Sequence, residues 1–235
     1  MKKLIFAVII GMFIYPSAFA DVTVFSDDFS ANTIGTNWTV VTSGEGNYAG
    51  ISPDGYVNYN LVNSGYAYLY SSAFAAQGQV NFSGSVFAGS YTLYPTPTQS
   101  SELAIFSSVD PSKYFKVSYE AASSKLRFED SGTFVSEIDW SNQPSFNWKN
   151  YNLTFDNSQW AFYQDSSPVW SHDSSTMSGA GSYFVGIGAM DEGYHYDYTL
   201  FDNVSATATA VPEPVSTVLF ILGGATLAVR RLRRK

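Results

Sequence analysis

The chain has no cysteine and only two histidines, His172 and His195, among its 235 residues. Disulfides and thiol chemistry are therefore excluded, and two histidines are too few for a multi-histidine metal centre. The adjacent Ser171, His172 and Asp173 have no G-x-S-x-G elbow around the serine, so their adjacency does not indicate a hydrolase triad. We expect His172 to lie in a Ser-His-Asp-Ser loop and each histidine to be a surface or half-buried polar residue.

Basic residues are also scarce through most of the chain. Residues 21–211 hold nineteen acids but only five cations, a net charge of −14. Nucleic acid is excluded as a partner, because phosphate binding needs a basic stripe. Excess acid of this kind is also typical of a surface that simply keeps a protein soluble. Neutral glycans, divalent cations and basic surfaces all stay open as partners. The five cations are Lys113, Lys116, Lys125, Arg127 and Lys149.

Residues 1–20 have the pattern of a secretory signal peptide. A positive start, Met1 to Lys3, precedes an apolar stretch from Leu4 to Tyr15, and Ala18-Phe19-Ala20 is a small-x-small cleavage site. The pattern predicts export and a mature protein that begins near Asp21.

Residues 211–235 form a second special segment. A Pro-Glu-Pro triplet is followed by an apolar stretch, predicted to be a helix over 215–229, and by a basic end over 230–235. Fifteen helical residues reach about 22 Å, short of the ~30 Å hydrocarbon core of a bilayer, so this transmembrane helix is a marginal anchor. Its cations would stay on the cytoplasmic side. A weak anchor suits a tail that is later cut.

These three parts, in this order at the C-terminus, resemble the PEP-CTERM tail that exosortases process in Gram-negative bacteria. The resemblance implies an exosortase as partner and an inner-membrane intermediate held through the tail before processing. It then implies a cell-surface or extracellular location. The sorting signal would consist of Pro212, Glu213, Pro214, Arg230, Arg231, Arg233 and Arg234.

The residues between these segments, 21–210, predict one β domain. Apolar Phe115, Val117 and Tyr119 alternate with polar neighbours, as in a sheet with one dry face. Ser131-Gly132 offers a tight turn, and no helical period exceeds a couple of turns. We expect an all-β, antiparallel two-sheet β-sandwich. Its clearest strands are expected over 22–25, 38–41, 79–88, 134–140, 183–190 and 198–208.

Four short stretches add a second resemblance. Asp27-Asp28-Phe29-Ser30 opens the domain and is followed by Asn37-Trp38-Thr39-Val40. Tyr114-Phe115-Lys116-Val117 lies in a central strand, and Phe201-Asp202-Asn203-Val204 lies near the end. They look like concanavalin A-like (laminin-G-like) jelly rolls, which implies that fold for residues 21–210.

Jelly rolls of this kind include family 16 glycoside hydrolases, whose motif is Glu, aliphatic, Asp and a second Glu. Glu137-Ile138-Asp139 matches the first half, but Trp140, Ser141 and Asn142 follow in place of the second acid. On one strand face the two carboxylates would lie about 6.5–7 Å apart, at the lower end of the inverting separation. We interpret them as solvent-facing acids, with no catalytic residue assigned. A carboxylate-dependent glycan hydrolase or lyase remains the alternative.

Aromatic residues indicate binding instead. Sugar rings stack on exposed aromatic faces beside hydrogen-bonding groups, and residues 56–70 and 191–198 offer both. Tyr66 and Tyr68 share a strand face with Tyr70 by the period of two. The candidate residues for an extracellular polysaccharide are Tyr66, Tyr68, Tyr194 and Tyr196.

Four oxygen-bearing residues suggest a structural calcium ion as the candidate cofactor. Asp27 and Asp28 follow the first strand, while Asp202 and Asn203 lie on the last, and terminal strands of jelly rolls often lie close. Hard oxygen ligands suit Ca²⁺.

The sequence thus predicts an exported, exosortase-processed protein that acts as a non-catalytic carbohydrate-binding or structural module. A purely structural role in a biofilm or matrix is the second alternative.

Overall fold

The computed structural model describes residues 21–31, 34–61, 64–76, 78–90, 100–120, 123–140, 147–156, 158–191 and 197–209. The predicted signal peptide, the sorting tail with its seven signal residues, and the candidates Tyr194 and Tyr196 lie outside these ranges. Within them, no helix is long and apolar enough to cross a membrane.

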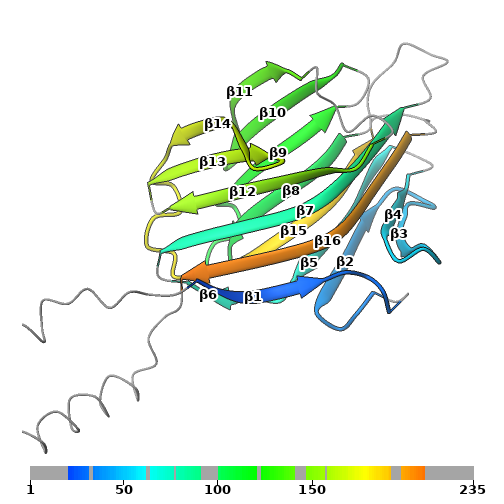
Figure 1. The fold of residues 1–235 in the computed structure, drawn as a ribbon, viewed down its shortest axis with the longest axis horizontal. Coiled ribbons are helices and arrows are strands. Elements are labelled where there is room, and N and C mark those ends of the chain that lie inside the picture. Colours follow the sequence, from blue (N-terminus) through cyan, green and yellow to red (C-terminus); the bar gives the residue numbers. More distant parts are fainter. Residues whose placement is uncertain are drawn as a thin grey trace, which may run out of the picture.

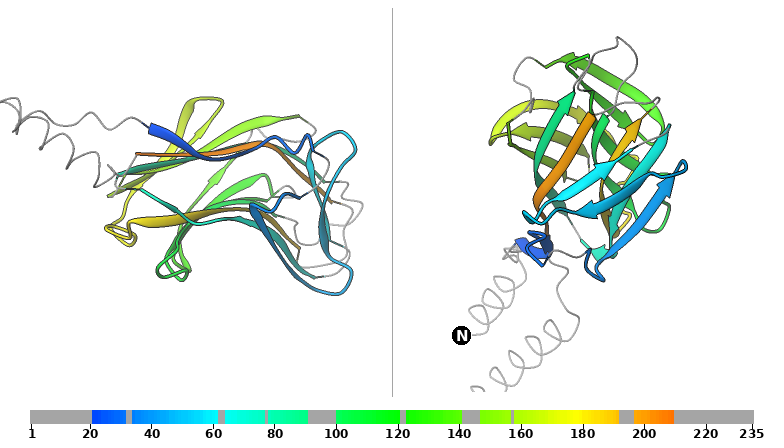
Figure 2. Two further views of the ribbon diagram at one scale, coloured as in Figure 1. Left: turned by 90° about the horizontal axis from the view of Figure 1, so that it is seen from below. Right: turned by 90° about the vertical axis from the view of Figure 1, so that its right-hand side faces the viewer.

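The described residues form two antiparallel sheets packed face to face (Figures 1 and 2). Sheet A has the order β14 (Ser167–Asp173), β13 (Gln159–Gln164), β12 (Lys149–Asp156), β7 (Gln79–Ser90), β16 (Asp197–Thr209), β4 (Val57–Asn60) and β3 (Tyr48–Ile51), and β1 (Asp21–Asp27) also pairs with β16. Sheet B has the order β11 (Thr133–Asp139), β10 (Lys125–Asp130), β9 (Tyr114–Glu120), β8 (Ser100–Ser107), β15 (Ser182–Asp191), β5 (Gly65–Ser71) and β2 (Trp38–Ser43), and β6 (Phe74–Ala75) also pairs with β15. The predicted all-β two-sheet sandwich is confirmed.

The first and last strands lie side by side, as expected from the sequence. β1 pairs antiparallel with β16, from Asp21 opposite Thr209 to Asp27 opposite Val204. Figure 1 shows the blue β1 beside the orange β16 at the front of the molecule. This pairing carries Asp27 and Asp28 toward the bulged part of β16.

Aromatic side chains fill much of the space between the sheets. Trp160 of sheet A stacks on Phe155 and on Phe115 of sheet B, with ring centroids 4.3 and 4.4 Å away. Phe128 of sheet B stacks at 4.0 Å on Trp170 of sheet A. Large aromatic rings bury much apolar area per residue, which suits a core without disulfides.

Two strands, β8 and β14, show how the structure differs from the sequence prediction. β8 was not predicted, because buried serines and Glu102 interrupt its apolar pattern. The expected loop at His172 is wrong: His172 lies in β14 and stacks on Trp170, with ring centroids 5.6 Å apart. β14 is an edge strand, where Pro168 costs the sheet no hydrogen bond to a further neighbour. The predicted turn is present, with φ of 51° at Ser131 and 80° at Gly132.

Candidate functional site

Three tyrosines of β5 project from the outer face of sheet B. Ala67 and Leu69 between them are buried in the core, whereas Tyr66, Tyr68 and Tyr70 are half-buried. The ring of Tyr68 lies 5.5 Å from that of Tyr66 and stacks on that of Tyr70 at 5.6 Å. The sequence-predicted candidates Tyr66 and Tyr68 are therefore neighbours on one face.

Two glycines of β15 let these rings lie close to the sheet. Gly188 pairs with Tyr68 and Gly186 with Tyr70. A Cβ at Gly188 would lie 1.9 Å from Cδ1 of Tyr68, and a Cβ at Gly186 would lie 2.9 Å from Cδ1 of Tyr70. Real Cβ atoms do not approach other heavy atoms so closely, so only glycine permits these ring positions.

Further rings extend this surface across β8, β9 and β15. Tyr70 meets Phe106 and Phe184 edge-on at 5.5 and 5.7 Å, and Phe106 packs against Tyr114 at 5.4 Å. Edge-to-face and stacked contacts of this kind stabilise aromatic clusters. We call the set the aromatic strip; its members are Tyr66, Tyr68, Tyr70, Phe106, Tyr114 and Phe184.

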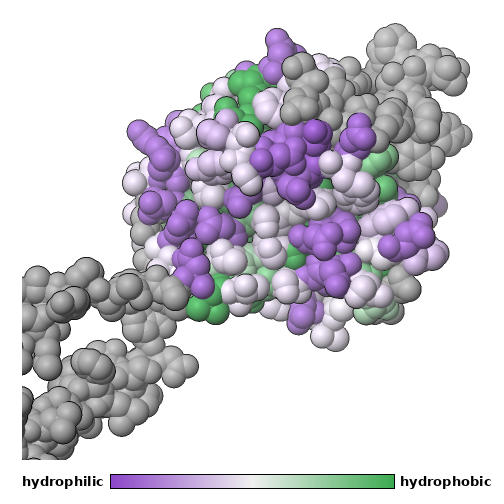
Figure 3. Space-filling view, in the orientation of Figure 1, coloured by the Kyte–Doolittle hydropathy of each residue, from purple (hydrophilic) through white to green (hydrophobic). Residues whose placement is uncertain are grey.

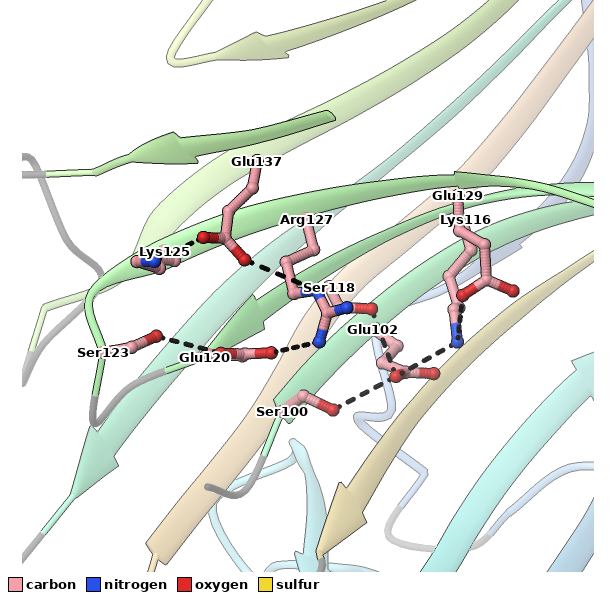
Figure 4. Close-up of polar contacts among 10 residues, drawn as sticks. All are labelled: Ser100, Glu102, Lys116, Ser118, Glu120, Ser123, Lys125, Arg127, Glu129 and Glu137. Atoms are coloured by element: carbon pink, nitrogen blue, oxygen red, sulfur yellow. Dashed lines mark hydrogen bonds and ion pairs between the residues drawn. The ribbon is translucent and has the colours of Figure 1, made fainter. Parts of the chain in front are cut away.

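A buried carboxylate lies beside the strip. Glu102 of β8 is only 2% exposed. Its Oε2 accepts a hydrogen bond from the Tyr68 hydroxyl. Its Oε1 accepts hydrogen bonds from Ser100 at 3.1 Å, Ser118 at 3.2 Å and Lys116 at 3.4 Å, which Figure 4 shows. A buried charge is tolerated only when it is paired and hydrogen-bonded, as here. The network fixes the hydroxyl end of Tyr68.

The same surroundings keep the tyrosines protonated. Burial, together with the negative charge of Glu102, raises the pKa of Tyr70 to about 12. Burial raises the pKa of Tyr68 further, with added contributions from the charge of Glu102 and from their hydrogen bond. Burial also raises the pKa of Tyr114, and its hydrogen bond to Glu129 is the second cause of this increase. All three are neutral hydrogen-bond donors at physiological pH.

Ion pairs cover the neighbouring part of this face. Lys116 of β9 lies 3.6 Å from Glu129 of β10, and Arg127 of β10 lies 3.0 Å from Glu120 and 3.6 Å from Glu137. Figure 4 shows the guanidinium of Arg127 between these two carboxylates. Three of the five cations in residues 21–211, Lys116, Lys125 and Arg127, are thus on one face.

This arrangement bears on the catalytic alternative. Glu137 lies on the edge strand β11 and is ion-paired with both Lys125 and Arg127. Asp139, two residues along the same strand, is exposed. Both oxygens of the Glu137 carboxylate are therefore engaged by cations, Oε1 by Lys125 and Oε2 by Arg127. The pair has the solvent-facing, ion-paired character of surface residues.

The predicted calcium ligands come together only in part. β1 and β16 do bring the two acidic segments close, since the negative charge of Asp28 contributes to a raised pKa of Asp202, after the larger effect of burial. The carboxylate of Asp27, however, accepts hydrogen bonds from Phe29 N and Trp38 Nε1, both at 2.8 Å. The described ranges contain no group of three acidic or histidine side chains able to hold a metal ion. These residues therefore do not form a calcium site by themselves.

Several residues of this surface escaped the sequence reasoning. Glu102, Gly186 and Gly188 position the tyrosines, and Phe106 and Phe184 enlarge the strip. One signal was available: Glu102 is the single charge in the apolar run that leads to Phe106. The glycines gave none, because their role depends on which strand lies beside β5.

No known protein family and no curated protein matches this sequence. Solved structures do match. The acidic lectin of winged bean, complexed with methyl-α-D-galactose, aligns with a TM-score of 0.63 and 8% identity over 81% of this chain and 99% of the lectin. The carbohydrate recognition domain of Emp47p gives 0.59 and 12%, covering 83% and 97% of the two chains. The carbohydrate-binding module CBM66 of Bacillus subtilis gives 0.52 and 14%, covering 73% and 95%.

Identities this low show the fold alone. The chain has the lectin-like, concanavalin A-like sandwich that the sequence predicted.

Proposed function

We propose that this protein binds an extracellular polysaccharide, without catalysis, through the outer face of sheet B. One observation carries the proposal: Tyr66, Tyr68 and Tyr70 form a continuous, half-exposed ladder of rings whose position requires two glycines and a buried carboxylate. Outward-facing side chains that are fixed in position by their neighbours are typical of a binding site rather than of a surface that only confers solubility.

The chemistry of the face suits a sugar. Aromatic rings pack against the C–H faces of a pyranose, and polar groups placed beside them select its hydroxyls. Here Glu129 accepts a hydrogen bond from Tyr114 of the strip. The ion-paired Arg127 and Glu120, on β10 and β9, offer further donors and acceptors on the same face. The lectins and the binding module that share this fold support the same class of ligand.

The two alternatives receive less support. A hydrolase or lyase would need a carboxylic acid free to donate a proton, whereas Glu137 is ion-paired. A purely structural role would be favoured if the tyrosines were core on both faces, but Tyr66, Tyr68 and Tyr70 are only half-buried.

The sequence patterns at both ends support export and exosortase processing. We propose an inner-membrane intermediate that is released from, or displayed on, the cell surface after cleavage near Pro212-Glu213-Pro214. Mass spectrometry of the protein from its native host should find Asp21 as the first residue and no peptide from 215–235. Recovery of the intact tail on the surface protein would contradict this processing.

The binding proposal is tested on a glycan array with paired tyrosine variants. Tyr66→Ala removes a half-buried ring of the strip and should weaken glycan binding about tenfold, the cost of one lost aromatic contact. Tyr48→Ala removes a ring that is 50% exposed on β3 of sheet A and should leave this binding unchanged. Equal affinity of both variants and the unmodified protein would sink the assignment of this face. Release of soluble sugar from the bound polymer would show an enzyme instead.

A further inference from the structure

The outer face of sheet A holds a hollow of about 500 Å³ whose lining carries no formally charged side chain. Figure 3 shows this face, where strongly hydrophilic residues lie among residues of near-neutral hydropathy over the strands of sheet A. The hollow lies over β7, β12, β13 and the bulge of β16. The lining residues used below are Ser83, Ser85, Asn150, Asn152, Tyr163 and Asn203.

Strand pairing places small hydroxyls and amides next to one another in this hollow. Ser83 of β7 pairs with Asn152 of β12, and Ser85 pairs with Asn150. The hydroxyl of Ser85 donates to Oδ1 of Asn150 at 2.9 Å. The Asn150 amide nitrogen carries two further N–H donors at the same place. Neutral donors and acceptors are therefore interleaved along two adjacent strands.

One of these groups is left without a partner. Oδ1 of Asn152 is buried, and no described residue donates a hydrogen bond to it. An acceptor in this position costs about 1–3 kcal/mol unless a ligand or a water donates to it. Asn152 also lines the hollow, so a turn of its side chain would present this oxygen to a donor there.

A strained backbone brings a further residue, Asn203, to the rim of the hollow, where its amide nitrogen donates to Asp202 at 2.8 Å. The pairing of β16 with β7 shifts between Asp202 and Ser205, which marks a β-bulge, and Asn203 within it has a φ of 50°. Bulges re-aim side chains, and a non-glycine residue in the left-handed region is uncommon in a strand. Here the bulge makes Asn203 part of the lining.

Aromatic rings stand at one end of this polar row. Trp148 precedes β12, so strand alternation puts it on the same face as Asn150 and Asn152. Its side chain is 42% exposed and packs against Phe87 at 5.6 Å and Tyr56 at 6.0 Å. An exposed tryptophan held by two other rings is a rigid stacking surface. From Trp148 to Asn152 the strand covers about 14 Å, enough for a short oligosaccharide.

We propose that this row is a second carbohydrate-binding site, with one sugar ring on Trp148 and the following sugars over Ser85, Asn150 and Asn152. The ligand is a neutral glycan, because no lining group would balance a phosphate, a sulfate or a carboxylate. The two sites lie on opposite outer faces of the sandwich, so one molecule joins two polysaccharide strands. This site is separate from the proposed site on sheet B and stands on different residues.

The test uses the purified full-length protein and neutral hexasaccharides of β-1,4-linked glucose, xylose or mannose, with affinity measured by calorimetry. Trp148→Ala should weaken at least one of these interactions tenfold or more, and Asn152→Ala about threefold or more. Trp148→Phe keeps an aromatic face and should stay within about threefold of the unmodified protein. Melting temperatures show whether each variant is folded.

Tyr66→Ala in the same assay separates this site from the one on sheet B. Loss of affinity in the Trp148 and Asn152 variants but not in Tyr66→Ala supports the second site and contradicts the first. The reverse pattern overturns the second site and leaves the first standing. Independent losses in both sets, with a stoichiometry of two, support both sites. Absence of binding to any hexasaccharide, or equal binding by all variants, overturns the second site.

Discussion

The two outer faces of the sandwich share one strand geometry but differ in chemistry. On sheet A, small neutral groups bond across strands: Ser83 to Ser205 at 2.9 Å and Asn81 to Thr207 at 3.2 Å. On sheet B, tyrosines lie flat over glycines beside a buried carboxylate. The inward-facing residues of both sheets must pack in the same core, so only the outward-facing residues are free to differ. The difference therefore reports function more directly than the core does.

The faces also differ in how firmly their binding groups are held. On sheet B, the rings rest against backbone, and Glu102 fixes the hydroxyl of Tyr68 with support from Lys116. On sheet A, Asn152 lines an open hollow, and its buried side-chain oxygen has no partner among the described residues. Substitutions that disturb sheet B should therefore cost folding stability as well as binding, whereas those in the hollow of sheet A should cost binding alone.

The largest expected effect comes from Gly188→Ala. The new methyl group would overlap the ring of Tyr68, which would have to leave its place and release its hydrogen bond to Glu102. Overpacking of this degree costs about 3 kcal/mol or more in the free energy of unfolding. Urea denaturation measures the loss, and binding at sheet B should disappear with it.

Gly50→Ala is the matched control in sheet A. A Cβ there would meet only the ring of Tyr48, at an ordinary 3.5 Å, so the free energy of unfolding should change by about 0.5 kcal/mol or less. Equal destabilisation by the two substitutions would show that the ring of Tyr68 does not need its glycine.

A smaller effect is expected from Lys116→Met. It leaves the carboxylate of Glu102, whose side chain is 3% exposed, with hydroxyl partners only. Loss of the cation from a buried pair should cost about 2 kcal/mol, less than for a pair with no other hydrogen bonds. Lys149→Met in sheet A breaks a pair with Asp165, which is 44% exposed, and should cost at most about 1 kcal/mol. Chemical denaturation of both variants compares the two; a larger loss for Lys149→Met would contradict the role of Glu102.

A double-mutant cycle that adds Glu102→Gln to Lys116→Met tests why the charge of Lys116 matters. If the cost arises from an unbalanced buried charge, the double variant should recover part of the stability that Lys116→Met loses. Additive losses would mean that the stem of Lys116, rather than its charge, stabilises this face.

These contrasts also show what the sequence could and could not reveal. Alternation placed Phe115, Val117 and Tyr119 in the core and Tyr66 and Tyr68 on one face, because a strand's side-chain period is fixed by local geometry. The pairing of β5 with β15 is a property of the whole chain, so the match of Gly188 with Tyr68 was not visible. Asn203 was singled out as a calcium ligand, while its bulged backbone depends on the register of β16 against β7.

The same limit explains the errors. His172 lies beside Ser171 and Asp173, whose turn-favouring character indicated a loop, but pairing with β13 draws the segment into an edge strand. Glu102 interrupts an apolar run. Its carboxylate is stabilised by hydrogen bonds from Tyr68 of β5 and Ser118 of β9, which lie on other strands. Local patterns predict local structure, and partners across strands decide the rest.

A smaller difference between the two faces is expected in how the free energy of unfolding depends on alkaline pH. The pKa of Tyr70 is near 10 when unfolded and is raised to about 12 in the folded protein. Between these pH values the folded state retains the proton that the unfolded state loses, so the free energy of unfolding falls as pH rises from about 10 to about 12. In Tyr70→Phe this fall should be shallower, whereas Trp148→Phe on sheet A should follow the unmodified protein. Urea titrations at several pH values measure how steeply the free energy of unfolding falls with pH. The same steepness in all three proteins would show that folding does not raise the pKa of Tyr70.

The smallest effect is expected from a chelator. Calcium would have to bind where β1 meets β16. The carboxylate of Asp27, however, accepts hydrogen bonds from Phe29 and from Trp38 of β2, and the carboxylate of Asp202 accepts two from Asn203. Only the repulsion between Asp28 and Asp202 would favour a cation there. Excess EDTA should therefore shift the melting temperature by less than about 1 °C, since a ligand stabilises only as far as it binds the folded state. A clear fall that added Ca²⁺ reverses, and that Asp202→Asn abolishes, would restore the calcium site and give sheet A an ion-dependent edge that sheet B lacks.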